Sequence, residues 1–198
     1  LVDIPGPKGL KKTSTLGWAS ATIDLRQPEC TLRKNLHGKW RNALVRAERA
    51  GLEVRSGSDG VAFAEFLDGH KEHLKKLGPD SSLSCTFLQT LNDRSPSNSK
   101  LLCLTAHQDN TYLGGIAIAK YGRTGEYLAG HNTNQGRANN ASHLLLWMAM
   151  IELKACSFKH FDLGGMDEKL TPPGIYRFKK RMGGIPYRLA NELEGGAD

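Results

Sequence analysis

The chain has 198 residues, of which 39% are hydrophobic, and this is enough to bury the core of one ordinary domain. It contains no apolar run near the roughly eighteen residues that a membrane-spanning helix requires, so we expect a soluble globular domain. The formal net charge of +7 favours an acidic partner only where the basic residues gather in one place.

The beginning of the chain carries little structural signal. Residues 1–16 are rich in proline, glycine and lysine without hydrophobic periodicity, and the first residue is Leu1 rather than methionine. We therefore predict an irregular linker over residues 1–19. Residues 20–198 are predicted to form a single domain, the carboxyl-terminal half of a longer protein.

The domain is predicted to open with a strand and a helix. Residues Ser20–Leu25 alternate as a strand does, and Pro28 and Glu29 then provide the proline and acid that are typical of a first helical turn. Apolar residues at helical spacing continue this helix to Ala47. Gly51 is expected to end it.

A short strand and two further helices are predicted next. The strand covers Leu52–Arg55, and Asp59 is expected to cap the helix that follows it. The apolar stripe of that helix is Phe63, Phe66, Leu67, Leu74 and Leu77. The third helix of this half passes through Cys85, Leu88 and Leu91.

From Lys100 onward the pattern changes to strands. Three strands are predicted, over Leu101–Ala106, Tyr112–Lys120 and Glu126–Ala129. The short polar segments between them have the composition of hairpin turns, so the three strands form an antiparallel meander.

The last part of the domain returns to alternating helices and strands. A polar loop over Asn132–Asn140 precedes the apolar segment Leu144–Ile151, which predicts a buried helix. A strand over Lys159–Leu163 follows, then a short basic helix that begins near Pro172 and a final strand near Tyr187. The whole order predicts the α/β (α+β) class, with a mixed, mostly antiparallel central sheet and helices on both faces.

Basic residues gather in two segments. Between Arg33 and Arg55 there are seven bases and two acids, and between Arg177 and Arg188 there are five bases and no acid. Such clusters suit RNA, a nucleotide pyrophosphate or anionic lipid headgroups, and they equally suit solvated helix faces. The four cysteines are widely spaced, which predicts reduced core thiols in a cytoplasmic protein and no metal centre.

Three strings, taken with the meander, resemble the FemABX branch of the Gcn5-related N-acetyltransferase (GNAT) superfamily, including its BioF2-like acetyltransferase domains. The first is TIDL at residue 22 followed by LHGKWRNALVRAERAGLEV over residues 36–54. The second is NASHLLLW at residue 140, which continues into HFDLGG over residues 160–165. The third and most specific is GIYRFKKRMGG over residues 174–184. Enzymes of this branch add amino acids to peptidoglycan precursors, and they commonly carry two GNAT-like halves.

The resemblance implies roles for the third string. In the family a Phe-Lys pair lies close to the aminoacyl end of a charged tRNA, so Phe178 and Lys179 are the expected catalytic residues, with Tyr176 and Arg177 beside them on the donor. An aromatic ring next to a cation can stack on and neutralise an acyl ester on a terminal adenosine. The alternative is that Phe178 is a core residue and Lys179 a solvated neighbour.

Acyl transfer to an amine also needs donors that stabilise an oxyanion. GNAT enzymes usually supply them from a bulged central strand, and Gly114-Gly115 offers a place for such a bulge. The other reading is a tight strand without any contact to the donor.

The family's coenzyme A loop is poorly matched. The expected pattern is Gln/Arg-x-x-Gly-x-Gly/Ala before the central helix, whereas this chain has QGRANN over residues 135–140. Arg137, Asn140 and His143 remain candidates for contact with the donor. The weak match favours charged tRNA as the donor, with acyl-CoA as the alternative and no permanently bound cofactor.

Acceptor contacts are expected from Lys39, Arg41 and His73. His70 lies on the apolar stripe of its helix and is interpreted as a core histidine, and two histidines three residues apart make a poor metal site. The predicted function is transfer of an aminoacyl group from tRNA to an amine of a peptidoglycan precursor or a peptide. Two alternatives stay open: a CoA-dependent N-acyltransferase acting on a small amine or a cell-envelope sugar, and a non-catalytic basic half-domain.

Overall fold

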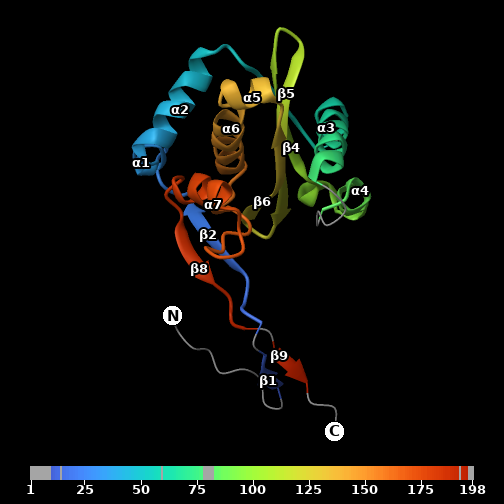
Figure 1. Ribbon diagram of the computed structural model, residues 1–198, viewed down its shortest axis with the longest axis vertical. Helices are drawn as coiled ribbons and strands as arrows, with labels where there is room; N and C mark the ends of the chain where they lie inside the picture. The colour runs from blue at the N-terminus through green and yellow to red at the C-terminus, as the bar shows by residue number, and fades with distance from the viewer. Residues whose placement is uncertain (1–9, 14, 59, 78–82, 192, 196–198) are drawn as a thin grey trace.

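The protein has three layers, with a sheet between two layers of helices (Figure 1). Its structure is a computed structural model that describes residues 10–13, 15–58, 60–77, 83–191 and 193–195. Within these ranges, every helix is too short or too polar to cross a membrane. The predicted α+β class is confirmed.

The central sheet has seven strands in the order β3-β4-β5-β6-β7-β2-β8. They are β2 (Ala19–Asp24), β3 (Glu53–Gly57), β4 (Leu102–Gln108), β5 (Thr111–Tyr121), β6 (Thr124–Asn132), β7 (His160–Asp162) and β8 (Ile185–Arg188). Neighbouring strands are antiparallel except β6 and β7, which run parallel. The predicted meander is β4, β5 and β6.

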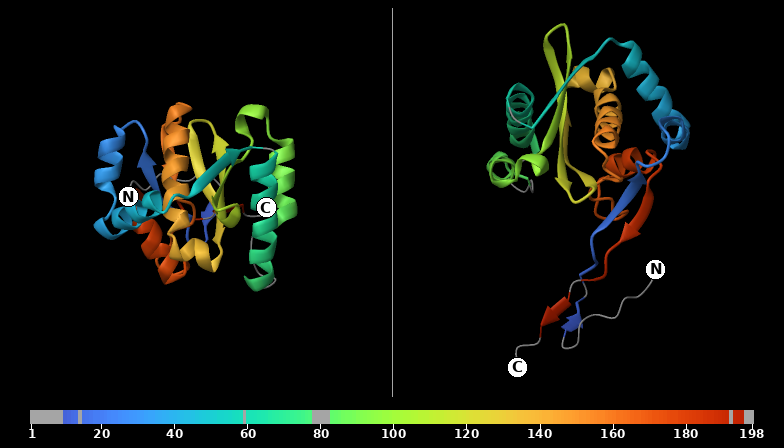
Figure 2. Two further views of the ribbon diagram at one scale, coloured as in Figure 1. Left: turned by 90° about the horizontal axis from the view of Figure 1, so that it is seen from above. Right: turned by 180° about the vertical axis from the view of Figure 1, so that it is seen from behind.

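Helices cover both faces of the sheet, which Figure 2 shows from above. They are α1 (Glu29–Asn35), α2 (Gly38–Arg49), α3 (Val61–Leu77), α4 (Cys85–Arg94), α5 (Asn134–Ala138), α6 (Ala141–Ala155) and α7 (Pro173–Lys180), with a 3-10 turn at Ser97–Ser99. The helices α3 and α4 cover one face, where Phe66 and Leu88 pack near Cys103 and Ala117. The other helices surround a larger core on the opposite face, centred on the buried helix α6.

The two parallel strands diverge after a short contact. β7 pairs with Thr124–Glu126 of β6, and in the described residues the pairing stops there. The edge of β6 from Tyr127 to Asn132 therefore has no β7 backbone beside it. This open edge lies next to the start of α6 and to α7, where a ligand can reach the strand.

A separate two-stranded ribbon joins the two ends of the domain. It consists of β1 (Leu10–Lys12) and β9 (Leu193–Gly195), which pair in antiparallel register away from the central sheet (Figure 1). The strand β1 lies within residues 1–19, for which the sequence predicted no regular structure. Its pairing partner lies more than 180 residues later in the chain, so no local pattern indicates it.

The single helix predicted from Pro28 to Ala47 is wrong, because the structure has two helices there. Leu36 is extended between α1 and α2, and the Nδ1 atom of His37 caps α2 by accepting a hydrogen bond from the backbone N–H of Lys39 at 3.2 Å. Leu36 is nevertheless fully buried. Apolar spacing therefore continues across the break and hides it.

The polar loop predicted over Asn132–Asn140 is also wrong in part, because it contains α5. The Thr133 hydroxyl accepts a hydrogen bond from the backbone N–H of Gly136 at 3.0 Å and caps this short helix. The buried helix that follows is confirmed and is longer than predicted. The cap predicted at Asp59 lies outside the described residues.

Candidate functional site

A pocket of about 320 Å³ lies at the open edge of β6, between the start of α6 and α7, and we call it the central pocket. Its lining includes Tyr127 and Gly130 from β6, Asn140 and His143 from the start of α6, and Phe178 and Lys179 from α7. Three segments that are far apart in the sequence therefore meet at one place. Two of them are the strings that carry the resemblance described above.

Lys179 is buried in the wall of this pocket. Its side chain is 7% exposed, and its ammonium donates a hydrogen bond to the carbonyl oxygen of Gly165 at 3.0 Å. It also lies 5.1 Å from the centre of the Tyr127 ring, within cation–π range. Burial lowers the pKa of Lys179 to about 8, although the negative charges of Asp162 and Glu126 raise it in part. The alternative of a solvated Lys179 is wrong.

A network around Asp162 fixes the turn on which Lys179 rests. The buried carboxylate accepts hydrogen bonds from the Ser20 hydroxyl at 2.5 Å, the Gly164 backbone N–H at 2.8 Å and the Tyr187 hydroxyl at 2.5 Å. These contacts tie β7 to β2 and β8. They hold the Gly165 carbonyl in place, so the position of the ammonium is set by the sheet rather than by α7 alone.

Phe178 joins three helices at the opposite wall. Its ring centre lies 6.0 Å from the centre of the Trp40 indole and 5.0 Å from that of the His143 imidazole, with the latter pair edge to face. Trp40 is fully buried, whereas Phe178 is half-buried and keeps part of its ring in the pocket. Burial lowers the pKa of His143 to about 4, so its imidazole is neutral at neutral pH.

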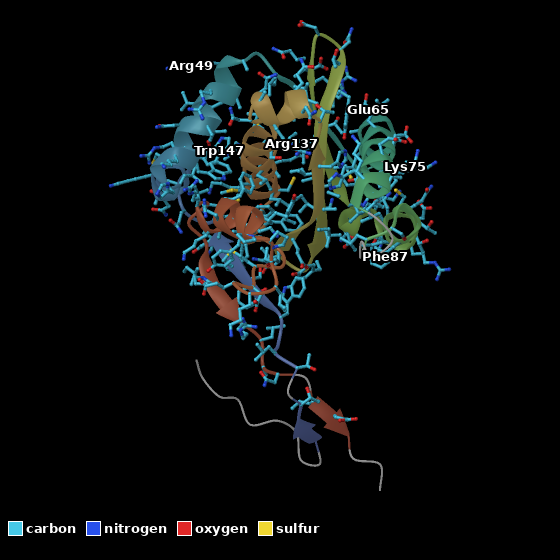
Figure 3. The ribbon with its side chains drawn as sticks, in the orientation of Figure 1. Arg49, Glu65, Lys75, Phe87, Arg137 and Trp147 are labelled. Carbon is cyan, nitrogen blue, oxygen red and sulfur yellow. The ribbon has the colours of Figure 1, made fainter. Side chains whose placement is uncertain are left out.

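The segment before α6 forms the rim. Arg137 of α5, labelled in Figure 3, and Asn140 both line the pocket. Asn140 adopts a left-handed conformation with φ of 58° where the chain turns into α6. The side-chain amide of Asn132 on β6 donates to the Ser142 hydroxyl at 2.5 Å, which links the open strand edge to the helix. The structure thus brings Arg137, Asn140 and His143 together, as the sequence predicted.

Gly114 and Gly115 lie on the predicted strand but outside the central pocket, where they were expected to contact the donor. Both are on β5, one strand away from the central pocket, whose β6 wall contains Gly130 instead. A Cβ atom on Gly114 would lie 2.4 Å from the Asn132 Oδ1 atom, and one on Gly115 would lie 2.8 Å from the Tyr112 hydroxyl. The two glycines therefore leave room for side chains of the site rather than for the donor.

The expected irregularity of the strands is present at two points. The pairing of β4 with β5 shifts between Ala106 and His107, opposite Leu113, which precedes Gly114. The pairing of β5 with β6 shifts between Ala117 and Ile118, opposite Leu128. The second shift lies on the strand that lines the central pocket, and the glycine pattern gave no signal for it.

A basic pocket of about 330 Å³ adjoins the central pocket and shares His143, Gly174 and Phe178 with it. Three cations line it, Lys39 from α2, Arg177 from α7 and Arg181 just after α7. Lys39 was expected to contact the acceptor. It lies instead beside Arg177, which was expected to contact the donor.

Two further residues of the prediction lie outside both of these pockets. Arg41 donates hydrogen bonds to the carbonyl oxygens of Lys34 and Leu36 at 3.2 and 3.5 Å, and so satisfies the end of α1. Tyr176 lies under the ammonium of Lys180, 5.4 Å from it, in a shallow hollow with Arg177.

A third pocket, of about 420 Å³, lies beneath α3, and we call it the α3 pocket. Its lining includes His73 and Lys76 from α3, Tyr112 from β5, His131 and Asn132 from β6, and Arg137. Asn132 and Arg137 line both the α3 pocket and the central pocket. Sequence reasoning singled out His73 but missed Tyr112, because an aromatic residue in a strand is ordinarily core.

No protein family model matches the chain, and no curated protein matches it. Solved structures do match its fold. It superposes on FemX with a TM-score of 0.76 and 13% identity, over 93% of this chain and 65% of FemX. It superposes on a tandem GNAT protein from the clavulanic acid biosynthesis pathway with a TM-score of 0.55 and 10% identity, over 100% of this chain and 62% of that one.

A third similar structure is a GCN5-related N-acetyltransferase from Sphaerobacter thermophilus, with a TM-score of 0.51 and 13% identity over 93% of this chain and 51% of that one. The chain therefore has the GNAT-like fold, of the kind found in FemX, that the sequence predicted. It spans less than two thirds of the length of each of these proteins.

Proposed function

We propose that this chain is the catalytic part of an acyltransferase that moves an aminoacyl group from charged tRNA to an amine of a peptidoglycan precursor or a peptide. The observation that carries the proposal is the position of Lys179, a buried cation in the wall of a pocket at the open edge of β6. FemX and GNAT proteins share this fold, which makes acyl transfer the class of reaction to test first. A second GNAT-like half in the complete protein is part of the proposal.

The adjoining basic pocket supports a polyanionic donor. An acyl ester in the central pocket would place its nucleotide beside Phe178, on which a base can stack. Phosphates further along the donor would meet Lys39, Arg177 and Arg181. We place the reaction in the cytoplasm, where charged tRNA is found and where the four free cysteines would stay reduced.

The two substrates supply every atom that the reaction exchanges. The amine nitrogen attacks the carbonyl carbon of the ester, the new C–N bond forms, and the bond from that carbon to the ribose oxygen breaks. The proton that the amine loses ends on the ribose hydroxyl. Negative charge develops on the carbonyl oxygen during the attack, and the buried ammonium of Lys179 would stabilise it.

A CoA-dependent N-acyltransferase is the second candidate, and one observation favours it. Arg137 of α5 and Asn140 at the start of α6 both line the central pocket, and a pyrophosphate would find backbone N–H groups at that helix start. The same attack would then break a bond from carbon to sulfur, and the thiol would take the proton.

A thermal-shift titration separates the two donors. Aminoacyl-tRNA, acetyl-CoA and a longer acyl-CoA are each added to the protein, because a ligand at about a hundred times its dissociation constant stabilises the fold by roughly 2.7 kcal/mol. We expect stabilisation by charged tRNA and less by the same tRNA without its aminoacyl group. Stabilisation by a thioester alone would favour the second candidate. A protein stabilised by uncharged tRNA as strongly as by charged tRNA would instead be a basic binding module.

The salt dependence of tRNA binding tests the basic pocket. In the double variant Arg177→Gln/Arg181→Gln, the slope of log K against log salt concentration should become shallower by roughly 1.5, because two phosphate contacts are lost. The matched control is Lys71→Gln/Arg94→Gln, which removes the same charge from the exposed surface of α3 and α4 on the opposite face. Equal slopes in both double variants would show that only net charge matters.

A further inference from the structure

The α3 pocket and the central pocket lie on opposite faces of the sheet and meet at one edge. Successive residues of β6 alternate between the faces, so Gly130 lines the central pocket while His131 lines the α3 pocket. Asn132, at the end of the strand, and Arg137 line both pockets. A group bound beneath α3 can therefore approach a group in the central pocket around the open edge of β6.

A buried pair of polar side chains forms the floor of the α3 pocket. The Tyr112 hydroxyl and the His131 Nε2 atom are 2.6 Å apart. His131 is 6% exposed, and its second ring nitrogen, Nδ1, is buried without a hydrogen-bond partner among the described residues. Leaving a buried imidazole nitrogen unpaired costs free energy, so the position of His131 is maintained at a cost to stability.

The fold makes room for this pair at a cost. Gly69 lies in the interior of α3, where glycine destabilises a helix by roughly 0.5–1 kcal/mol relative to alanine. A Cβ atom there would lie 2.3 Å from the His131 Nε2 atom and 2.6 Å from the Tyr112 hydroxyl. On β5, a Cβ atom on Gly115 would lie 2.8 Å from the same Tyr112 hydroxyl. Both glycines are explained by the need to bring the pair under the helix.

The charges around the pair indicate what it would hold. Burial lowers the pKa of His131 to about 3 and also lowers the pKa of His73, so both imidazoles are neutral at neutral pH and can accept a hydrogen bond. Lys76 and Arg137 supply positive charge at the pocket. The one carboxylate of the lining, that of Glu72, is paired with Lys75 at 2.6 Å.

We propose that the α3 pocket is the acceptor site, and that it takes a primary amine whose molecule also carries an anionic group. The anionic group lies between Lys76 and Arg137, and the amine donates to His73 and to the Tyr112 hydroxyl oxygen, which is itself paired with His131. In the described residues no cluster of His, Cys, Asp or Glu is arranged to hold a metal ion. The assignment of this pocket to the acceptor substrate rests on the proposed function.

The test is a binding experiment that needs no donor. Histidine ring resonances of the protein are followed by NMR during titration with lysine, which has a carboxylate, with phosphoethanolamine, which has a phosphate, and with cadaverine, which has amines only. The His131→Gln and His73→Gln variants assign the resonances. We expect at least one of the two anionic amines, lysine or phosphoethanolamine, to shift the ring resonances of His131 and His73. The concentration needed should be about tenfold lower than for cadaverine.

Two exposed lysines on α3 give a matched pair of variants. Lys76→Gln should weaken binding of the anionic amine about tenfold and leave cadaverine unchanged, whereas Lys71→Gln, outside the pocket, should change neither. The proposal is overturned if no probe shifts His131 below about 100 mM, or if Lys76→Gln and Lys71→Gln behave alike. Failure of every donor in the thermal-shift titration would count against the proposed function and leave this binding result unaffected.

Discussion

Lys179→Met should reduce turnover by about 10²–10³-fold, the loss typical of removing one preorganised electrostatic donor. The ammonium lies in the wall of the central pocket and is held in place by the Gly165 carbonyl. Methionine has a similar length and suits the apolar surroundings of Tyr127 and Phe178. We therefore expect a folded, inactive protein, with binding of the donor changed much less than kcat.

The same variant should change how stability depends on pH. The pKa of Lys179 is lowered to about 8 from its ordinary value of 10.5, so between these values the unfolded chain binds more protons than the folded one. The contribution of Lys179 to the free energy of unfolding of the wild type therefore rises as the pH is raised from about 8 to 10.5. Methionine does not titrate, so the difference in stability between the two proteins should move in favour of the wild type by on the order of 3 kcal/mol across this window.

Denaturant unfolding at pH 7, 9 and 10.5 measures this difference, and single-turnover kinetics measure the loss of rate. The control is Lys180→Met, the next residue, which is exposed and lies over Tyr176 outside the central pocket. It should keep nearly full activity and show no pH-dependent difference. Full turnover in Lys179→Met, or a stability difference that stays constant with pH, would contradict the role given to the buried ammonium.

Much of this arrangement could be predicted because its signals are local. Apart from the break between α1 and α2, the short helix α5 and the β1–β9 ribbon, the order of strands and helices follows from apolar spacing. The proline before α7 marks where that helix begins. Phe178 and Lys179 are adjacent in one string, so a resemblance in that string pointed to both. Whether Lys179 is buried could not be predicted, since its burial depends on the Gly165 turn and on Tyr127.

The parts that could not be predicted depend on contacts between distant segments. Tyr112 and His131 are separated by a whole hairpin, and they pair because Gly69 of α3 and Gly115 of β5 leave them room. Gly114-Gly115 was interpreted as a place where the donor approaches the backbone. The interpretation was right that close approach requires glycine there, but the approaching groups are Asn132 and Tyr112 of the protein itself.

Gly136→Ala should destabilise the protein by about 2–3 kcal/mol, as overpacking of a tight contact does. Gly136 is buried in α5, and a Cβ atom on it would lie 2.0 Å from the carbonyl oxygen of Leu113. That oxygen belongs to the backbone of β5 and also accepts a hydrogen bond from the Thr133 N–H at 2.8 Å. Neither partner is a flexible side chain, so the clash can be relieved only by moving α5.

Movement of α5 would also reach the site, because the next residue, Arg137, lines both the central pocket and the α3 pocket. Gly136→Ala should therefore raise KM for donor and acceptor together, whereas Arg137→Gln should raise both and leave stability nearly unchanged. Gly38→Ala is the control, since no atom lies within 4 Å of its Cβ position at the start of α2, and it should stabilise by up to about 1 kcal/mol. An unfolding midpoint of Gly136→Ala equal to that of the wild type would mean that α5 shifts at no cost, and the segment would then be a hinge rather than a fixed rim of the site.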